Sequence, residues 1–171
     1  MIISSDHSYI PNQAIKDLEE IIEKHNIKGI IASSIGGYYA TYLSNKYNLK
    51  TVLINPSVSP YTTTTKYLGE NERQDGVKFI WKKSHLKELK KLRVEKIKKE
   101  NFFIFLQKGD IVLDYRIALN RYNGSKMVVE DGGNHRFKGF ERFFNEVSDF
   151  LNISHLKTGT TPYIYSDSLS Y

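Results

Sequence analysis

Short apolar runs alternate with amphipathic stretches along most of this chain, and this alternation restricts its possible folds more than any other feature. Runs with the length and composition of buried strands occur at Ile2–Ile3, Gly29–Ala32, Thr51–Ile54, Phe102–Leu106 and Lys126–Val129. Strands that are separated by helices usually pair in parallel, because the helix supplies the long crossover that a parallel connection needs. The sequence therefore predicts an α/β fold whose mostly parallel sheet of about five strands is flanked by helices.

The stretches between these runs have helical periodicity. The predicted helices span Pro11 to His25, Gly36 to Tyr47, about Asp114 to Tyr122, and Phe140 to Leu151. A longer excursion over residues 57–100 interrupts the alternation. The length of 171 residues fits one domain over residues 1–153, followed by a polar tail over residues 154–171 that we expect to add little to the core.

Much of the net charge of +6 comes from one basic run, which extends from Lys78 to Lys99. Such a run can attract phosphate or an anionic membrane surface. It can equally be the wet face of a helix, because Leu86, Leu89 and Leu92 recur between the lysines at roughly helical spacing. We favour the solvated face, and we expect neither nucleic-acid binding nor stable insertion into a membrane.

The absence of cysteine excludes disulfides and thiolate metal sites and fits a reducing compartment. The first residues lack the basic segment and long apolar run of a secretion signal. No stretch reaches the ~20 apolar residues that span a bilayer. These features predict a soluble, cytoplasmic protein.

A serine with small neighbours lies between a predicted strand and a predicted helix. In that position a tight turn exposes the Ser34 hydroxyl at the carboxyl end of the sheet, and the crowded backbone requires small residues such as Ala32 and Gly36. The helix directs its free N–H groups toward the same point, which makes the N–H of Ile35 a candidate oxyanion donor. Such turns also occur as structural elements or phosphate cradles, so the motif alone leaves both interpretations open.

An acid and a base follow later strands in the order that a Ser-Asp-His triad requires. Asp110 lies just past the strand that ends at Leu106. Asp114 is the competing carboxylate, but its position before Tyr115 predicts a helix cap. His135 follows the last strand after two glycines, which allow a loop sharp enough to bring the imidazole back toward Ser34.

The other histidines give weaker signals. His7 follows the first predicted strand and can lie near the site, whereas His25, His85 and His155 have polar, helical surroundings. No pair has metal-ligand spacing supported by carboxylates, and no glycine-rich loop ends in Lys-Ser or Lys-Thr. The sequence therefore predicts neither a metal nor a cofactor.

Several segments, in order along the chain, resemble those of the YqiA-type esterases, small bacterial α/β-hydrolases that are related to YcfP-like proteins. The resemblance extends over residues 2–151 and is strongest at Ser33–Ala40, Asn55–Val58, Tyr67–Gly69, Gly109–Tyr115 and Gly132–His135. It implies the α/β-hydrolase fold and cleavage of short acyl esters or thioesters without a cofactor. It also implies that Ser34, Asp110 and His135 are nucleophile, acid and base.

One departure concerns the beginning of the chain. Proteins of this family open with a strand that ends in His-Gly-Phe, whose loop supplies a second oxyanion donor, and this chain has no such segment. Ile2–Ile3 resembles the strand that follows it. We expect either that the natural protein starts upstream of Met1 or that the sheet has closed up, with about five strands in sequence order. The residues after Ser4, or the His7 side chain, can then supply the second donor.

Two functions of different classes follow. The leading hypothesis is a serine esterase or thioesterase that acts on a small-molecule substrate, with Tyr38, Tyr39, Tyr61, Tyr115 and His7 as candidate pocket residues. The alternative is a catalytically weak or inactive hydrolase-fold binding protein that lacks a complete oxyanion hole. The sequence predicts no particular oligomeric state.

Overall fold

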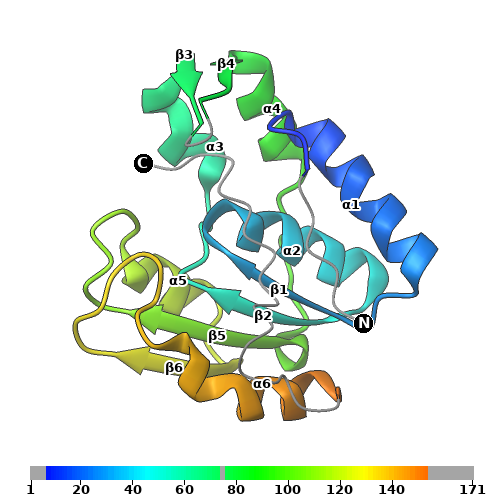
Figure 1. Ribbon diagram of the computed structural model, residues 1–171, viewed down its shortest axis with the longest axis vertical. Helices are drawn as coiled ribbons and strands as arrows, with labels where there is room; N and C mark the ends of the chain where they lie inside the picture. Colours follow the sequence, from blue (N-terminus) through cyan, green and yellow to red (C-terminus); the bar gives the residue numbers. More distant parts are fainter. Residues whose placement is uncertain (1–6, 74–75, 154–171) are drawn as a thin grey trace.

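A four-stranded parallel sheet forms the centre of the molecule in the computed structural model, which describes residues 7–73 and 76–153 (Figure 1). Its strands are β1 (Gly29–Ser33), β2 (Lys50–Ile54), β5 (Phe102–Gln107) and β6 (Lys126–Glu130), in the spatial order β1-β2-β5-β6. The predicted mostly parallel sheet is thus confirmed, and its described strands follow sequence order. The predicted strand Ile2–Ile3 and the predicted tail lie outside the described residues.

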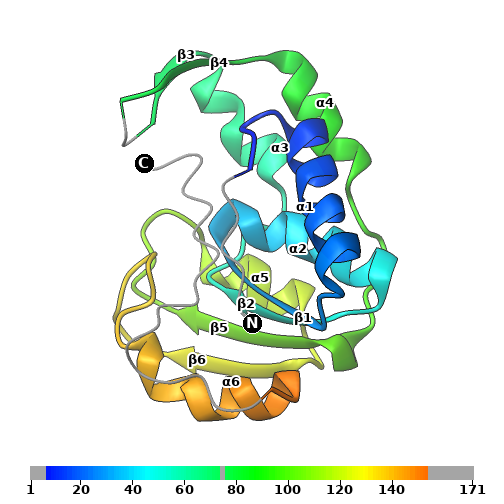
Figure 2. The same cartoon turned by 45° about the vertical axis from the view of Figure 1, so that its right-hand side comes forward.

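Helices cover the two faces of this sheet (Figure 2). One face carries α1 (Pro11–His25), α2 (Ser34–Tyr47) and α5 (Tyr115–Arg121), and the other carries α6 (Phe144–Leu151). Strand β5 contacts both layers because successive side chains of a strand point to opposite faces. Phe102, Ile104 and Leu106 pack with α2 and α5, whereas Phe103 and Phe105 pack toward α6.

The helix boundaries have local causes. Helix α1 begins with Pro11 at its first position, where the missing N–H has no cost. Helices α1, α2 and α6 each end at an asparagine in the left-handed conformation, with φ of 49° at Asn26, 54° at Asn48 and 54° at Asn152. The predicted helix over residues 140–151 is split, because a 3-10 turn, Phe140–Phe143, follows the left-handed Gly139 and precedes α6.

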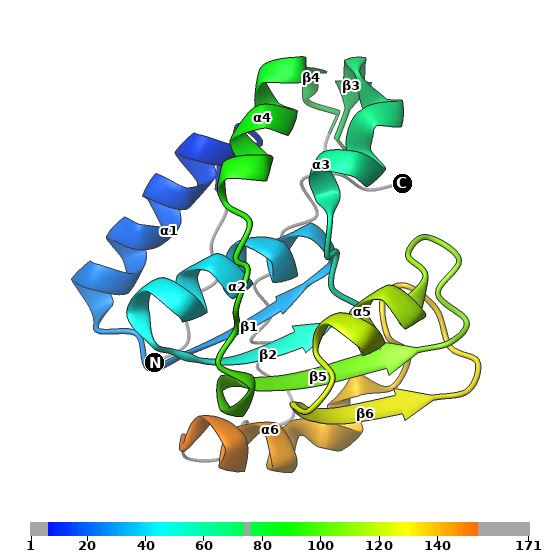
Figure 3. The ribbon, with the colours of Figure 1, turned by 180° about the vertical axis from the view of Figure 1, so that it is seen from behind.

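The excursion after β2 lies over the α1–α2 side of the molecule (Figure 3). It contains α3 (Pro60–Thr63), the 3-10 turn Thr64–Tyr67, β3 (Gly69–Glu72), β4 (Lys78–Trp81) and α4 (Lys83–Lys91). Strands β3 and β4 form an antiparallel ribbon that the sequence patterns did not predict, since only four residues of each strand pair.

The basic run is therefore not one helix. Its first residues belong to β4, and α4 ends at Lys91. The lysines of the run are exposed, whereas Leu89 and Leu92 are buried. This distribution fits the solvated-face interpretation. Among residues 7–73 and 76–153, no helix has the length and apolar character needed to cross a membrane.

Candidate active site

The turn between β1 and α2 holds Ser34 in a strained conformation. Its φ is 49°, which costs a residue with a side chain about 1–2 kcal/mol relative to ordinary helical geometry. The carbonyl of Ser34 accepts a 2.9 Å hydrogen bond from the N–H of Ser57. A Cβ atom on Gly37 would come within 2.7 Å of Pro56 Cβ, so only glycine allows β2 and its exit loop to approach α2 this closely. These contacts fix the position of the Ser34 hydroxyl.

His135 reaches Ser34 from the loop that follows β6. The Ser34 hydroxyl lies 2.9 Å from His135 Nε2, and His135 Nδ1 lies 2.7 Å from Asp110 Oδ2. An ionised carboxylate can only accept a hydrogen bond, so Nδ1–H donates to Asp110. Nε2 then accepts a hydrogen bond from the Ser34 hydroxyl. This tautomer, with the proton on Nδ1, is the one that a general base requires.

Asp110 is held in place by its second oxygen. Oδ1 accepts hydrogen bonds from the backbone N–H groups of Val112 at 2.8 Å and Leu113 at 2.9 Å. The side chain is 2% exposed, compared with 21% for the side chain of His135. The carboxylate is therefore oriented and removed from solvent, with Oδ2 directed at the imidazole.

Asp114 has the capping role that its position predicted. Its carboxylate accepts a hydrogen bond from the N–H of Arg116 at the start of α5 and also pairs with the Arg116 guanidinium at 2.7 Å. Hydrogen bonds from the Arg116 side chain and backbone lower the pKa of Asp114. Asp114 is exposed, and neither its hydrogen bonds nor its ion pair reach His135.

Two buried amides to which the sequence patterns assigned no role hold the His135 loop. Asn55, with φ of 40°, donates through Nδ2 to the carbonyls of Asn134 and His135, each at 3.0 Å. Its Oδ1 accepts a 3.0 Å hydrogen bond from the backbone N–H of Gln107. Asn55 thus connects the end of β2, the end of β5 and the histidine loop. Asn55 lies in a segment that resembles the YqiA-type esterases, but that resemblance assigned it no role.

Gln107 uses all of its side-chain hydrogen-bonding capacity. Oε1 accepts from the N–H groups of Asn134 at 3.0 Å and Lys138 at 2.8 Å. Nε2 donates to the carbonyl of Lys138 at 2.9 Å and to Glu130 at 3.0 Å. Hydrogen bonds from Gln107 and Arg142 lower the pKa of Glu130. The sequence signal available for Gln107 was a polar residue directly after the apolar run Phe102–Leu106.

Glycines let the two loops approach each other. The N–H of Gly109 donates to the carbonyl of Gly132 at 2.7 Å, and a Cβ on Gly109 would lie 2.5 Å from the carbonyl oxygen of Gly133. Gly133 itself has φ of 73°. The acid loop and the base loop are therefore packed backbone against backbone.

The other predicted site residues lie in several places. Ile35 is buried in the first turn of α2, next to Ser34. His7 is buried against the edge of Tyr39, and its Nδ1 lies 3.0 Å from the carbonyl of Ser8. No described contact joins His7 to Ser34. Tyr38 lines a cavity together with Tyr61, whereas Tyr39, Tyr115 and His7 do not line it. Within the described part of the chain, no group of three or more potential metal ligands occurs.

Solved structures with the same architecture show the fold of this protein. Est1E from Butyrivibrio proteoclasticus, with ferulic acid bound, matches with a TM-score of 0.63 at 15% identity over 85% of this chain and 69% of its own. A monoacylglycerol lipase from Paleococcus ferrophilus gives 0.58 at 15% identity, covering 85% and 76%. The mouse alpha/beta hydrolase domain-containing protein 10 gives 0.56 at 15% identity, covering 83% and 69%. The fold is that of the α/β-hydrolases.

A sequence comparison assigns the chain to a protein family. Residues 1–152 match the model of the uncharacterised protein family UPF0227, the YqiA family. The chain belongs to this family, as its motifs predicted.

Proposed function

We propose that this protein is a serine hydrolase that cleaves short acyl esters or thioesters through an acyl-serine intermediate. The observation that carries the proposal is the chain of hydrogen bonds from Ser34 to His135 at 2.9 Å and from His135 to Asp110 at 2.7 Å. The strained φ of Ser34 and the burial of Asp110 support it, because both are typical of a nucleophile and acid held ready for reaction. The α/β-hydrolase fold adds a compatible framework.

The proposed reaction has two half-reactions. His135 Nε2 takes the proton of Ser34 as Oγ attacks the acyl carbon, and the imidazolium then gives this proton to the leaving alcohol or thiol. In the second half, His135 takes a proton from water, the hydroxide attacks the acyl-serine, and Ser34 Oγ leaves with that proton. Asp110 keeps the imidazole oriented and stabilises its positive charge. The N–H of Ile35 is the proposed donor to the oxyanion.

A fluorophosphonate probe tests the nucleophile, because it phosphonylates an activated serine. We expect the natural chain to be labelled and Ser34→Ala to lose labelling completely. Ser33→Ala is the matched control, since Ser33 is the adjacent residue and takes no part in the described hydrogen bonds to His135. Labelling that survives in Ser34→Ala would contradict the proposal. Rates with p-nitrophenyl butyrate and its thioester analogue then distinguish esterase from thioesterase activity.

A further inference from the structure

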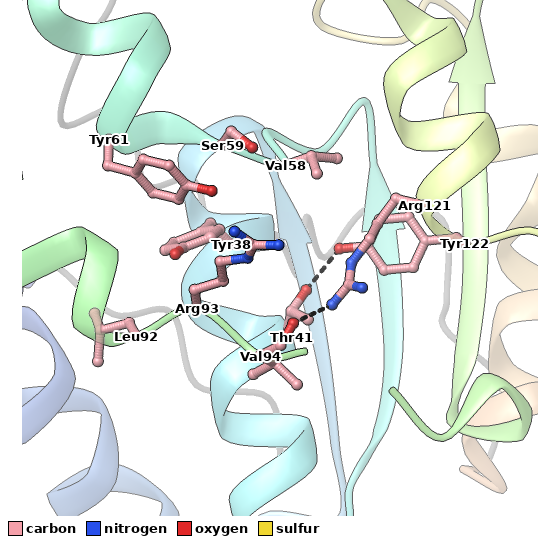
Figure 4. Close-up of a pocket in the computed structure, with 10 residues that line it drawn as sticks. All are labelled: Tyr38, Thr41, Val58, Ser59, Tyr61, Leu92, Arg93, Val94, Arg121 and Tyr122. Carbon is pink, nitrogen blue, oxygen red and sulfur yellow. Dashed lines mark hydrogen bonds between the residues drawn. The ribbon is translucent and has the colours of Figure 1, made fainter. Parts of the chain in front are cut away.

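A cavity of about 230 Å³ lies between α2, α5, the loop before α3 and the segment after α4 (Figure 4). Its lining includes Tyr38, Val58, Tyr61, Leu92, Arg93 and Arg121. Ser34, Asp110 and His135 do not line it. The cavity is therefore separate from the proposed catalytic residues, although Val58 directly follows the Ser57 that contacts the Ser34 carbonyl.

Two arginines bring positive charge to this cavity from different walls. Figure 4 shows the guanidinium groups of Arg93 and Arg121 directed toward its interior. None of the ten described lining residues is an aspartate or glutamate. Two arginines in a partly enclosed lining that contains no carboxylate attract anions, because the low local dielectric strengthens Coulomb interactions.

Arg121 is held by hydrogen bonds, and within residues 7–73 and 76–153 it forms no ion pair. Its guanidinium donates to the carbonyl of Glu95 at 3.0 Å and to the carbonyl of Val94. Both partners are neutral backbone groups, and the residue is half-buried at the end of α5. The guanidinium is thus oriented in advance and retains its full charge, and its remaining N–H groups can donate to a ligand.

Arg93 forms an ion pair that a ligand can replace. It pairs with Glu95 at two points, from Nε to Oε1 at 3.2 Å and from Nη2 to Oε2 at 3.3 Å, but its side chain is 52% exposed and that of Glu95 is 73% exposed. Exposed pairs of this kind contribute only about 0–1 kcal/mol. A ligand anion inside the cavity can therefore compete with Glu95 for the Arg93 guanidinium.

The remaining walls are aromatic and aliphatic, with polar hydroxyls. The rings of Tyr38 and Tyr61 pack edge to face, and Val58 and Leu92 complete an apolar surface. The hydroxyl of Tyr38 donates to the carbonyl of Leu89 at 2.8 Å. Burial raises the pKa of Tyr38, while the nearby positive charges of Arg93 and Arg121 lower it. The electrostatic field of both arginines therefore acts at the Tyr38 side of the cavity.

We propose that the cavity is a binding site for a small organic anion. Its carboxylate or phosphate group binds Arg93 and Arg121, and its apolar body lies against Tyr61 and Val58. Arginine suits both oxyanions, because its planar fork can donate two parallel hydrogen bonds. The cavity is smaller than most ligand pockets, so its volume limits the ligand to a compact molecule. This proposal does not depend on the reactivity of Ser34.

Calorimetric titration with benzoate, phenyl phosphate and neutral benzamide tests this site. We expect one or both anions to bind and benzamide to bind at least tenfold more weakly. The stronger anion identifies a carboxylate or a phosphate as the preferred group. Failure of both anions to bind, or equal binding of benzamide, would overturn the proposal.

Arginine variants locate the binding. Arg93→Gln and Arg121→Gln should each weaken anion binding at least tenfold, while Arg116→Gln, an exposed position on the same helix as Arg121, should leave it unchanged. If Arg121→Gln unfolds when checked by circular dichroism, the exposed Arg93→Gln decides the result. Unchanged binding in Arg93→Gln, or an equal loss in Arg116→Gln, contradicts a specific site.

Discussion

At the level of single residues, the two oxygens of Asp110 have different tasks. Oδ1 receives two backbone N–H groups, which fix the carboxylate, and Oδ2 faces the imidazole of His135. Asp114, four positions later, uses its carboxylate for the start of α5 and for Arg116. One aspartate, Asp110, therefore contacts a histidine, and the other, Asp114, caps a helix, because the backbone around the two residues differs.

Replacing each aspartate by asparagine separates these tasks. Asp110→Asn presents an amide to His135 and favours the wrong tautomer, so we expect turnover to fall by about 10³–10⁴-fold. Asp114→Asn retains a residue that caps helices well and should change turnover less than about threefold. Steady-state hydrolysis of p-nitrophenyl butyrate by both purified variants is the measurement. A larger loss in Asp114→Asn would reverse the assignment of the acid.

At the level of elements, the site depends on loops that pack closely because glycine and buried amides permit it. The loop after β6 is held by the amides of Asn55 and Gln107, which come from the ends of β2 and β5. Gly132 and Gly133 both have positive φ, at 67° and 73°. Their surroundings differ, since an added Cβ on Gly132 meets no atom within 4 Å, whereas on Gly133 it would lie 1.9 Å from Gln107 Oε1.

This difference gives a matched pair of alanine variants. Both substitutions place alanine at a left-handed position, at a similar cost of about 1 kcal/mol. Gly133→Ala must also displace the Gln107 amide, which leaves the N–H groups of Asn134 and Lys138 without their partner. We expect Gly133→Ala to lower the free energy of unfolding by about 2 kcal/mol more than Gly132→Ala.

Urea unfolding measures that difference in stability. Turnover should fall with stability, by about 10–100-fold in Gly133→Ala, because small displacements of the proposed catalytic base, His135, are costly. Equal stability of the two variants would show that Gln107 can rearrange without loss.

At the level of the whole molecule, the layer between the sheet and helices α2 and α5 contains buried tyrosines. Tyr122 hydrogen-bonds to Thr41 at 2.8 Å and packs against Phe102 of β5. Burial raises the pKa of Tyr122 to about 12 and raises the pKa values of Tyr38 and Tyr39 as well. Ionisation of these phenols is thus opposed in the folded protein but not in the unfolded chain.

The sign of the resulting pH dependence follows from proton binding. Above pH 10 the unfolded chain loses the Tyr122 proton, whereas the folded protein keeps it until about pH 12. The free energy of unfolding should therefore fall with rising pH in this window, by up to about 1.4 kcal/mol per pH unit for this group. Urea unfolding at pH 8, 10 and 11 should show a shallower fall for Tyr122→Phe. Parallel curves for the two proteins would contradict the assignment.

The sequence by itself determined the parallel sheet, the limits of α1 and the placement of Ser34, Asp110 and His135 after three different strands. Those features depend on local signals: apolar periodicity, a proline at a helix start, small residues at a turn. Tertiary structure decided which distant groups meet. Asn55 and Gln107 contact the histidine loop, and Arg93 and Arg121 face one cavity, through the way in which the layers pack. Such contacts join residues far apart in the chain, and no local pattern encodes the distance between them.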